Sequence, residues 1–277
     1  MNADNERCFI IPCLMNKRKG SETRPPRGAF IVEHNMTAQY ENQKMRQGYT
    51  RVIGCDEVGR GSLAGPVVAG AVILPTAAGE LKVKSYKVYK VIRDSKLLSP
   101  GKREELALEI KKIALAWSVA EVSSGIIDKI NIHNASLLAM KRAVRNLCRQ
   151  TGVNAADGLA RATDQSGWFL FLDGKFPIPE CHLEQEAVIG GDNKILSVAA
   201  ASIIAKVYRD DLMRRYHKKY PIYNFACHKG YATFHHRQVV KRHGLSEIHR
   251  VSFCKNIKAR TNVKVAAHNR TPKKTAA

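Results

Sequence analysis

Two apolar, β-branched runs lie on either side of a glycine-rich turn between residues 50 and 74, and this arrangement restricts the fold more than any other feature. Thr50–Cys55 and Pro66–Leu74 have the length and composition of buried strands. The turn between them contains Gly59, Gly61 and Gly65. Glycine allows a sharp reversal because it has no side chain to clash with the backbone. The sequence therefore predicts a strand, a tight turn and a second strand.

Strand-like and helix-like segments alternate after this turn. Further strands are expected at residues 116–122 and 168–172, and helices at residues 100–115, 134–150, 194–218 and 233–243. Ser99 and Pro100 are typical of a helix start, where serine caps the chain and proline fits the first turn. Interleaved strands and helices favour an α/β fold, with the helices after about residue 193 gathered in a C-terminal portion.

The charge of the chain points to polyanionic partners. Its 46 Lys and Arg exceed its 24 Asp and Glu, which gives a formal net charge of +22 in 277 residues. Such an excess creates a positive field that attracts nucleic acid. Composition alone is equally compatible with a basic protein that only coats RNA.

Three features bear on compartment and on the ends of the chain. The seven cysteines are scattered without CxxC spacing, so neither a disulfide framework nor a zinc site is indicated. The longest apolar run is too short to cross a membrane and no secretory signal opens the chain, so a cytoplasmic location is expected. We expect residues 1–48 to be a poorly ordered extension, residues 49–254 to form the main domain and residues 255–277 to form a basic tail.

Four acids stand at predicted element boundaries. Asp56 and Glu57 follow the first strand, Asp173 follows the strand WFLFL, and Asp192 precedes a helix of small residues. Each has a structural alternative: a solvated surface turn for the pair, a strand leaving the core for Asp173, and helix capping for Asp192. The strand must break after Asp56 if neighbouring residues are to face one site, and the following glycines make that break possible.

The helix after Asp192 carries Val198, Ala201, Ser202 and Ala205 at helical spacing, which predicts close packing on a sheet. Such packing would bring the four acids together, where their charges would repel one another unless divalent cations neutralised them. Carboxylate oxygens favour Mg²⁺ or Mn²⁺ over zinc. Two such ions would suit the hydrolysis of a phosphodiester.

Six sequence blocks stand out along the chain: DEVGRGSLAGPVVAGAVIL (56–74), DSKLLS (94–99), LDGKFPIP (172–179), GDNKILSVAAASIIAKVYRD (191–210), HKGYATFHH (228–236) and HRVSF (249–253). Together, over about residues 50–254, they resemble one family, ribonuclease HII, the bacterial type 2 ribonuclease H. The resemblance implies a ribonuclease H-like fold, in which helices flank a mixed β-sheet and the C-terminal portion is helical. It also implies an endonuclease that cuts the RNA of RNA/DNA hybrids, and cuts 5′ of ribonucleotides embedded in duplex DNA, as in ribonucleotide excision repair.

The resemblance also assigns roles to residues. The metal-binding catalytic acids fall on Asp56, Glu57, Asp173 and Asp192, and two ions would leave 3′-hydroxyl and 5′-phosphate ends. The backbone of Gly59, Arg60 and Gly61 would recognise the 2′-hydroxyl, and Tyr231 would pack on the following deoxyribose. The remaining expected substrate contacts are Ser95, Lys96 and Lys229, with Lys206 and Arg209 as further phosphate contacts.

Each of these substrate contacts has a structural alternative. They are a half-buried core residue for Tyr231, a polar turn for residues 94–96, and solvated side chains for the basic residues. Gly190 and Ala232 depart from the family pattern, in which lysine and glycine are usual, and substrate affinity could differ there. We expect a monomer. A noncatalytic nucleic-acid-binding protein and a junction-resolving nuclease of the same broad fold stay open as alternatives.

Overall fold

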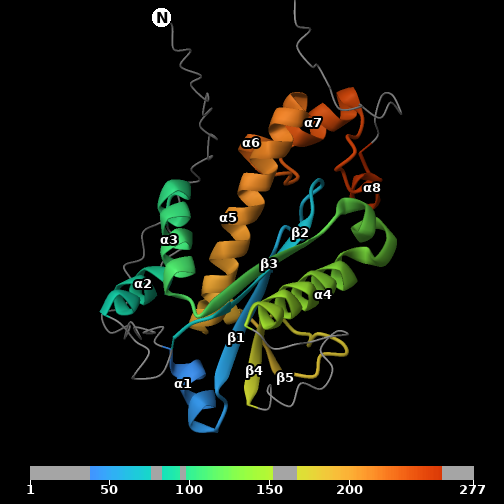
Figure 1. Ribbon diagram of the computed structural model, residues 1–277. Coiled ribbons are helices and arrows are strands. Elements are labelled where there is room, and N and C mark those ends of the chain that lie inside the picture. Colours follow the sequence, from blue (N-terminus) through green and yellow to red (C-terminus); the bar gives the residue numbers. More distant parts are fainter. Residues whose placement is uncertain (1–37, 76–82, 94–97, 152–166, 258–277) are drawn as a thin grey trace, which may run out of the picture. The chain divides into compact units, whose positions relative to one another are not determined.

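The structure is a computed structural model that describes residues 38–75, 83–93, 98–151 and 167–257 (Figure 1). The strands are β1 (Arg51–Val58), β2 (Val67–Ile73), β3 (Ala116–Val122), β4 (Trp168–Asp173) and β5 (Glu184–Val188). The helices are α1 (Gln39–Arg46), α2 (Val83–Arg93), α3 (Pro100–Ile113), α4 (Ser124–Gln150), α5 (Leu196–Lys219), α6 (Phe225–His228), α7 (Phe234–His243) and α8 (Val251–Cys254), with short 3₁₀ helices η3 (Gly191–Asn193) and η4 (Pro221–Tyr223). No helix in the described ranges is long and apolar enough to cross a membrane.

The five strands form one mixed sheet in the order β3-β2-β1-β4-β5. β1 pairs antiparallel with β2 and parallel with β4, while β5 runs parallel to β4 at the edge. The glycine-rich stretch connects β1 to β2 as expected, and the parallel connection from β3 to β4 passes through α4. The α/β fold with a mixed sheet is confirmed.

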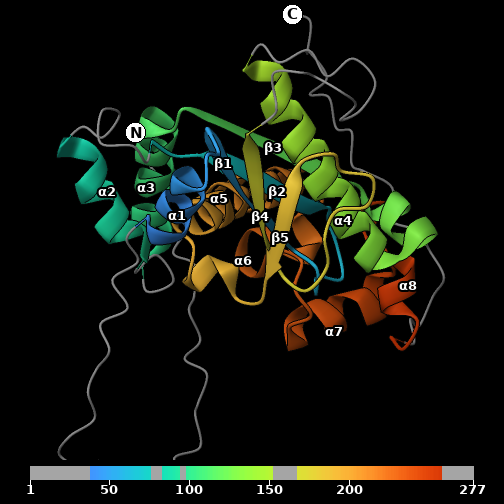
Figure 2. The same ribbon diagram turned by 90° about the horizontal axis from the view of Figure 1, so that it is seen from below.

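Helices cover both faces of this sheet (Figures 1 and 2). On one face, Ala135, Ala139 and Ala143 of α4 join a core cluster with Ile53 and Ile73. On the other face, α5 packs on β1 and β2, and α2 and α3 extend its apolar cluster. The division follows the strand period, because alternate residues of a strand point to opposite faces.

The contact between α5 and the sheet is backbone to backbone. A Cβ atom added to Gly54 of β1 would lie 2.1 Å from the carbonyl carbon of Ser197, and one added to Gly70 of β2 would lie 2.5 Å from the carbonyl oxygen of Ala201. Only glycine on the strands and small residues on the helix allow this approach. The close packing predicted for this helix is therefore confirmed.

α1 lies within the segment for which we expected poor order, and that expectation is wrong for residues 38–48. Glu41 is buried, and its carboxylate accepts a hydrogen bond of 2.7 Å from the backbone N–H of Ser197 in the first turn of α5. A carboxylate at a helix N-terminus satisfies a backbone N–H that has no partner within the helix. Burial raises the pKa of Glu41, and these hydrogen bonds oppose the rise. The residues before 38 lie outside the described ranges.

Other boundaries also differ from the predicted ones. β1 continues through Val58 instead of ending at Cys55, since its pairing with β2 extends to Val58 and Val68. α4 begins ten residues before the predicted Asn134, and Asn131 interrupts it with φ of 65°. The strand β5 and the helix α2 were not predicted. β5 is too polar to show a clear apolar period, whereas α2 has one, since Val88, Tyr89 and Ile92 are buried on one side of the helix.

The C-terminal portion packs against the turn between β1 and β2. Ala64 joins a cluster with Tyr223, Phe225, Val240 and Ile248. Two isolated β-bridges, Ser62 with Tyr231 and Ala64 with His249, fasten the turn to this portion. The expected helical C-terminal portion is confirmed, and its function in the fold is to hold one side of that turn.

Candidate active site

Asp56 and Asp173 lie side by side at the carboxyl ends of the parallel strands β1 and β4. Cys55 of β1 pairs with Leu172 of β4, so the next residues, Asp56 and Asp173, occupy adjacent positions. Neighbouring strands are about 4.8 Å apart. Both residues share the face on which Gly54 meets α5, because they follow the strand period of two. Functional side chains gather at such strand ends in α/β proteins.

Asp192 is brought to the same edge by the turn before α5. It lies in η3, and the backbone N–H of the preceding Gly191 donates a hydrogen bond of 2.7 Å to Oδ1 of Asp173. A Cβ atom on Gly191 would lie 3.5 Å from that same Oδ1 atom. The end of β4 and the turn carrying Asp192 are thereby fixed to each other.

Asp56 lies in a strongly perturbed environment. It is 5% exposed. Burial raises its pKa well above the usual range, and the charges of Glu57, Asp173 and Asp192 raise it further. A hydrogen bond from Ser202 of α5 acts in the opposite direction. The three other acids therefore lie close enough for their charges to act on Asp56.

Glu57 faces a different set of neighbours. Burial raises its pKa, the charge of Asp173 adds to the rise, and the guanidinium of Arg60, whose Nη1 lies 2.9 Å from Oε1, lowers it. Among the described residues, its other oxygen, Oε2, is buried without a hydrogen-bond partner. The backbone N–H of Glu57 donates a 2.6 Å hydrogen bond to Oδ1 of Asp56. This hydrogen bond joins the two acids. We expected the strand to break after Asp56, but β1 continues through Val58.

These residues fit a divalent cation. Oε2 of Glu57 is buried without a hydrogen-bond partner among the described residues, and three other acids act on the raised pKa of Asp56, so a cation bound here would relieve both. Carboxylate oxygens are the ligands that Mg²⁺ and Mn²⁺ prefer. Within the described residues, no three His, Cys, Asp or Glu side chains are already arranged to hold an ion. The acids are thus adjacent without having converged into a ligand set.

The turn beyond the acids has two different kinds of glycine. Gly59 adopts φ of +93°, and an added Cβ would lie 2.1 Å from Nε of Arg209. The fold itself requires glycine there. Gly61 has nothing within 4 Å of an added Cβ and is exposed. Nothing in the described fold requires glycine at 61.

Tyr231 lies next to this turn, and we call its partly exposed side chain the Tyr231 wall. Tyr231 is 36% exposed, so part of it is accessible at the surface. The bridge to Ser62 and the hydrogen bond from the Leu63 N–H to the Gly230 carbonyl oxygen hold its backbone against the turn. The cationic groups of Lys206 and Arg209 lie 5.8 and 5.5 Å from the ring centroid.

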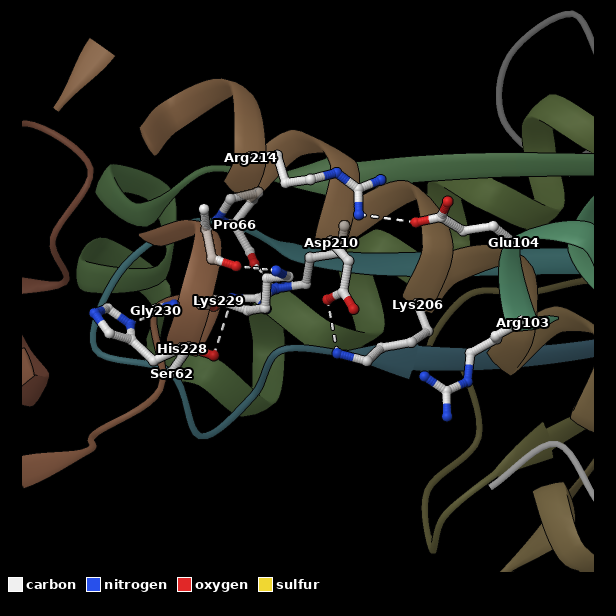
Figure 3. Close-up of polar contacts among 12 residues, drawn as sticks. Ser62, Pro66, Arg103, Glu104, Lys206, Asp210, Arg214, His228, Lys229 and Gly230 are labelled. Carbon is white, nitrogen blue, oxygen red and sulfur yellow. Dashed lines mark hydrogen bonds and ion pairs between the residues drawn. The ribbon is translucent and has the colours of Figure 1, made fainter. Parts of the chain in front are cut away.

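The basic residues predicted to contact the substrate differ in their environments. Figure 3 shows the Lys206 ammonium directed at Asp210, 2.7 Å away, rather than left free in solvent. Lys229 is partly buried, its ammonium donates to the Ala226 carbonyl oxygen, and burial lowers its pKa. Arg209 is fully buried, so the prediction of a phosphate contact is wrong for this residue. Ser95 and Lys96 lie outside the described residues.

A comparison with sequence families decides the assignment. The family described as Ribonuclease HII matches residues 53–256, which include all four acids, the turn and Tyr231. The chain belongs to the ribonuclease HII family. It is 42% identical to the Ribonuclease HII of Caldicellulosiruptor bescii over 219 residues, which cover 79% of this chain and 94% of that protein.

Further relatives agree with this membership. The Ribonuclease HII of Pelotomaculum thermopropionicum is 46% identical over 214 residues, 77% of this chain and 71% of that protein. The crystal structure of the ribonuclease H2 from Pyrococcus horikoshii OT3 superposes with a TM-score of 0.55 at 22% identity, covering 76% of this chain and 97% of that one, and supports the fold. As a member of this family, the protein is a metal-dependent endonuclease that cleaves the RNA of RNA/DNA hybrids. The two alternatives raised above, a noncatalytic binder and a junction-resolving nuclease, are thereby set aside.

Sequence reasoning missed three groups of residues in this ribonuclease HII. Ser202 was noted only for its small size, although its hydroxyl bonds Asp56. Arg250 lies within the block HRVSF without having been singled out, yet it is fully buried. The third group is the histidine trio of His228, His236 and His249, which is buried behind Tyr231. An excess of histidine between residues 228 and 249 was the available signal.

The rings of the histidine trio are neutral and are held together by hydrogen bonds and stacking. Nδ1 of His249 accepts from the Ser246 N–H at 2.9 Å, so its proton is on Nε2, which lies 3.0 Å from Nε2 of His236. His236 then carries its proton on Nδ1 and donates it to the Tyr231 carbonyl oxygen at 2.8 Å. His228 stacks on His236 with ring centroids 4.2 Å apart. Nδ1 of His228 accepts from the Gly230 N–H at 3.2 Å, so protonating the acceptor nitrogen of any of the three rings would break a hydrogen bond.

We expect acid to destabilise the protein through this trio. Burial lowers the pKa of His249 to about 3 and of His228 to about 4, and lowers that of His236 as well. Because these values lie below those of the unfolded chain, near 6.5, the unfolded state binds more protons as the pH falls from about 6.5 toward 4. Each histidine then reduces the free energy of unfolding by up to about 1.4 kcal/mol per pH unit.

Urea unfolding at pH 7.5, 6.5 and 5.5 measures this loss. The variant His249→Gln should be less stable at pH 7.5 and should lose stability less steeply below pH 6.5. Replacing the exposed His243 by asparagine serves as the control and should leave the slope unchanged. Equal slopes for wild type and His249→Gln would show that His249 is not a source of the loss.

Proposed function

We propose that Asp56, Glu57, Asp173 and Asp192 form the catalytic metal centre of this ribonuclease HII, and that it cuts 5′ of a ribonucleotide in duplex DNA as well as within hybrids. The observation that carries the proposal is the register of β1 and β4, which sets Asp56 beside Asp173. The coupling of Asp56 to the other three acids supports the set. The neighbouring turn and Tyr231 supply the adjacent surface for the sugars.

In this proposal, the four carboxylates would hold two Mg²⁺ or Mn²⁺ ions, which would supply an activated water and stabilise the departing 3′-oxygen, so that the products carry a 3′-hydroxyl and a 5′-phosphate. The chain prepares the carboxylates for this task. Ser202 donates to Asp56 and favours its charged form. Arg60 does the same for Glu57, and the Gly191 N–H orients Asp173. Asp56 and Asp173 project from strand ends, which are rigid supports.

Recognition in this proposal uses the backbone of Gly59, Arg60 and Gly61 for the 2′-hydroxyl and the ring of Tyr231 for the next deoxyribose. A hydroxyl donates and accepts hydrogen bonds, and an exposed backbone without side chains can approach it closely. We further propose Ser95, Lys96 and Lys229 as contacts for the sugar–phosphate backbone. Each would add affinity without reading sequence.

A labelled duplex with one embedded ribonucleotide tests the reaction. Incubation with Mg²⁺ or Mn²⁺ should give a single cut on the 5′ side of the ribonucleotide, and a chelator should stop it. An all-DNA duplex of the same sequence should stay intact. Absence of the cut with both metals would refute the proposal for embedded ribonucleotides, while cleavage of the all-DNA duplex would refute recognition of the sugar.

Gly61→Ala should impair the binding and cleavage of the substrate without affecting the fold. An added methyl has open space and an ordinary backbone conformation in the described structure, so the melting temperature should not change. The methyl would separate the backbone from a sugar, and kcat/KM should fall on the order of 10- to 100-fold. Gly101→Ala in α3, which also has open space, is the matched control and should retain full activity. Equal activity of the two variants would exclude a close approach at 61.

The remaining assignments are proposals of the same kind. We propose a monomer that acts in the cytoplasm, with the catalytic domain at residues 49–254 preceded by the helix α1. The basic residues of segment 255–277 would add affinity for phosphates that depends on salt but not on sequence.

A further inference from the structure

Two arginines are fully buried beneath the turn between β1 and β2. Arg209 of α5 and Arg250, which precedes α8, are both 0% exposed. Within the described part of the chain, neither guanidinium forms an ion pair with a carboxylate. Burial and then the charge of Arg209 lower the pKa of Arg250 to about 9, so it stays charged at neutral pH. Two buried cations side by side are unfavourable unless their donors are satisfied.

Arg250 is satisfied by the carbonyl groups of the turn. Its Nη2 donates to the carbonyl oxygen of Gly59 at 2.7 Å, its Nη1 to that of Arg60 at 2.7 Å, and its Nε to that of Gly65 at 3.0 Å. The guanidinium is planar and presents its donors in a fixed fork. It therefore fixes the orientation of three peptide groups at once.

This orientation determines where the backbone N–H groups point. In a planar trans peptide the N–H lies opposite to the C=O. Because the carbonyl groups of Gly59 and Arg60 point inward at Arg250, the N–H groups of Arg60 and Gly61 point away from it, and both residues are exposed. Arg250 thus directs two successive N–H donors away from the interior.

Arg209 connects the same turn to the Tyr231 wall. Its Nη2 donates to Oγ of Ser62 at 2.9 Å, and its Nη1 donates to the Lys229 carbonyl oxygen at 3.0 Å. Figure 3 shows Ser62, Pro66 and Lys229 gathered at this point, and Nε donates to the Pro66 carbonyl oxygen at 3.1 Å. The guanidinium also lies 5.5 Å from the Tyr231 ring centroid. One side chain therefore spans both elements that face the sugars.

We propose that Arg209 and Arg250 are positioning residues that set the outward N–H groups of the turn at a fixed place relative to the Tyr231 ring. The proposal rests on the proposed function, in which the turn reads a 2′-hydroxyl and the ring packs on the next deoxyribose. Discrimination between ribose and deoxyribose then depends on two residues that touch neither sugar. Affinity for duplex in general depends on surface charge and is retained without them.

Binding to two duplexes tests this role. In an Asp173→Asn background with Mg²⁺, fluorescence anisotropy gives the Kd for a duplex with one ribonucleotide and for the all-DNA duplex of the same sequence. The ratio of the two Kd values reports discrimination by the folded fraction. Arg250→Gln should reduce this ratio about tenfold or more, and Arg250→Lys, which keeps the charge but not the fork, should also reduce it. Ser62→Ala, which removes one acceptor of Arg209, should reduce it severalfold.

Val144→Ala in α4 is the control for stability. It opens a cavity in the core far from the turn in the sequence and should lower the melting temperature while leaving the ratio unchanged. If the parent itself binds both duplexes equally, the proposed function fails. If the parent discriminates, and Arg250→Lys and Ser62→Ala keep the full ratio, the positioning role is overturned. Loss of the ratio in Val144→Ala as well would overturn it too, by showing that general destabilisation suffices.

Discussion

Asp173→Asn is expected to reduce cleavage of an RNA/DNA hybrid by on the order of 10³-fold or more, with little change in stability. The side chain stands beside Asp56 at the end of β4, so its charge belongs to the proposed metal centre. The amide oxygen of asparagine can still accept the hydrogen bond from the Gly191 N–H, which explains why the fold should persist. Initial rates at saturating Mg²⁺ and a thermal melt measure both parts of the prediction.

Glu180→Gln is the matched control for the loss of one acid. Glu180 is exposed and pairs with Lys141 at the surface. Surface ion pairs contribute little, so cleavage and melting temperature should stay close to wild type. Retention of more than a tenth of the activity by Asp173→Asn would remove this residue from the catalytic set.

Gly54→Ala should destabilise the protein by about 3 kcal/mol, at the upper end of the usual cost of overpacking. The new Cβ would lie 2.1 Å from the carbonyl carbon of Ser197 and 2.3 Å from the backbone nitrogen of Val198. Backbone atoms cannot rotate away as a side chain can, so the first turn of α5 would have to move. That turn follows Asp192, and the same helix carries Ser202, so cleavage should fall along with stability. Urea unfolding and the hybrid cleavage assay measure the two effects.

Gly125→Ala provides the comparison within the same chain. Gly125 lies in α4 with nothing within 4 Å of an added Cβ. Alanine should stabilise this helix by about 0.5–1 kcal/mol because glycine loses more backbone freedom on folding. A loss for Gly54→Ala no larger than 1 kcal/mol would show that α5 can move away from β1 at little cost.

The sequence could predict which residue types matter but not every partner. The four acids and the exposed Tyr231 are local signals, because each stands at the end of an apolar run or in a short motif. The adjacency of Asp56 and Asp173 depends on the register between β1 and β4, which are more than a hundred residues apart. Apolar periodicity identifies strands but does not state which strands pair.

Arg209 shows a second limit of sequence reasoning. In a basic chain an arginine next to acidic and basic neighbours is most often at the surface, and periodicity places Arg209 only on one side of α5. Its burial is decided by two carbonyl groups and a serine hydroxyl of a turn more than 140 residues earlier. Glu41 is similar, since its partner, the Ser197 N–H, is provided by a helix that forms 156 residues later in the chain.

The turn that contains Gly59 and Gly61 continues directly from the strand that carries Asp56 and Glu57, with Val58 between them. In the proposed function, the group that senses the sugar and the group that breaks the bond therefore belong to one short, rigid length of chain. The chain therefore fixes the distance between the recognised 2′-hydroxyl and the phosphodiester bond that is cleaved. An insertion of one residue after Val58 would change this distance, and with it the position of the cut.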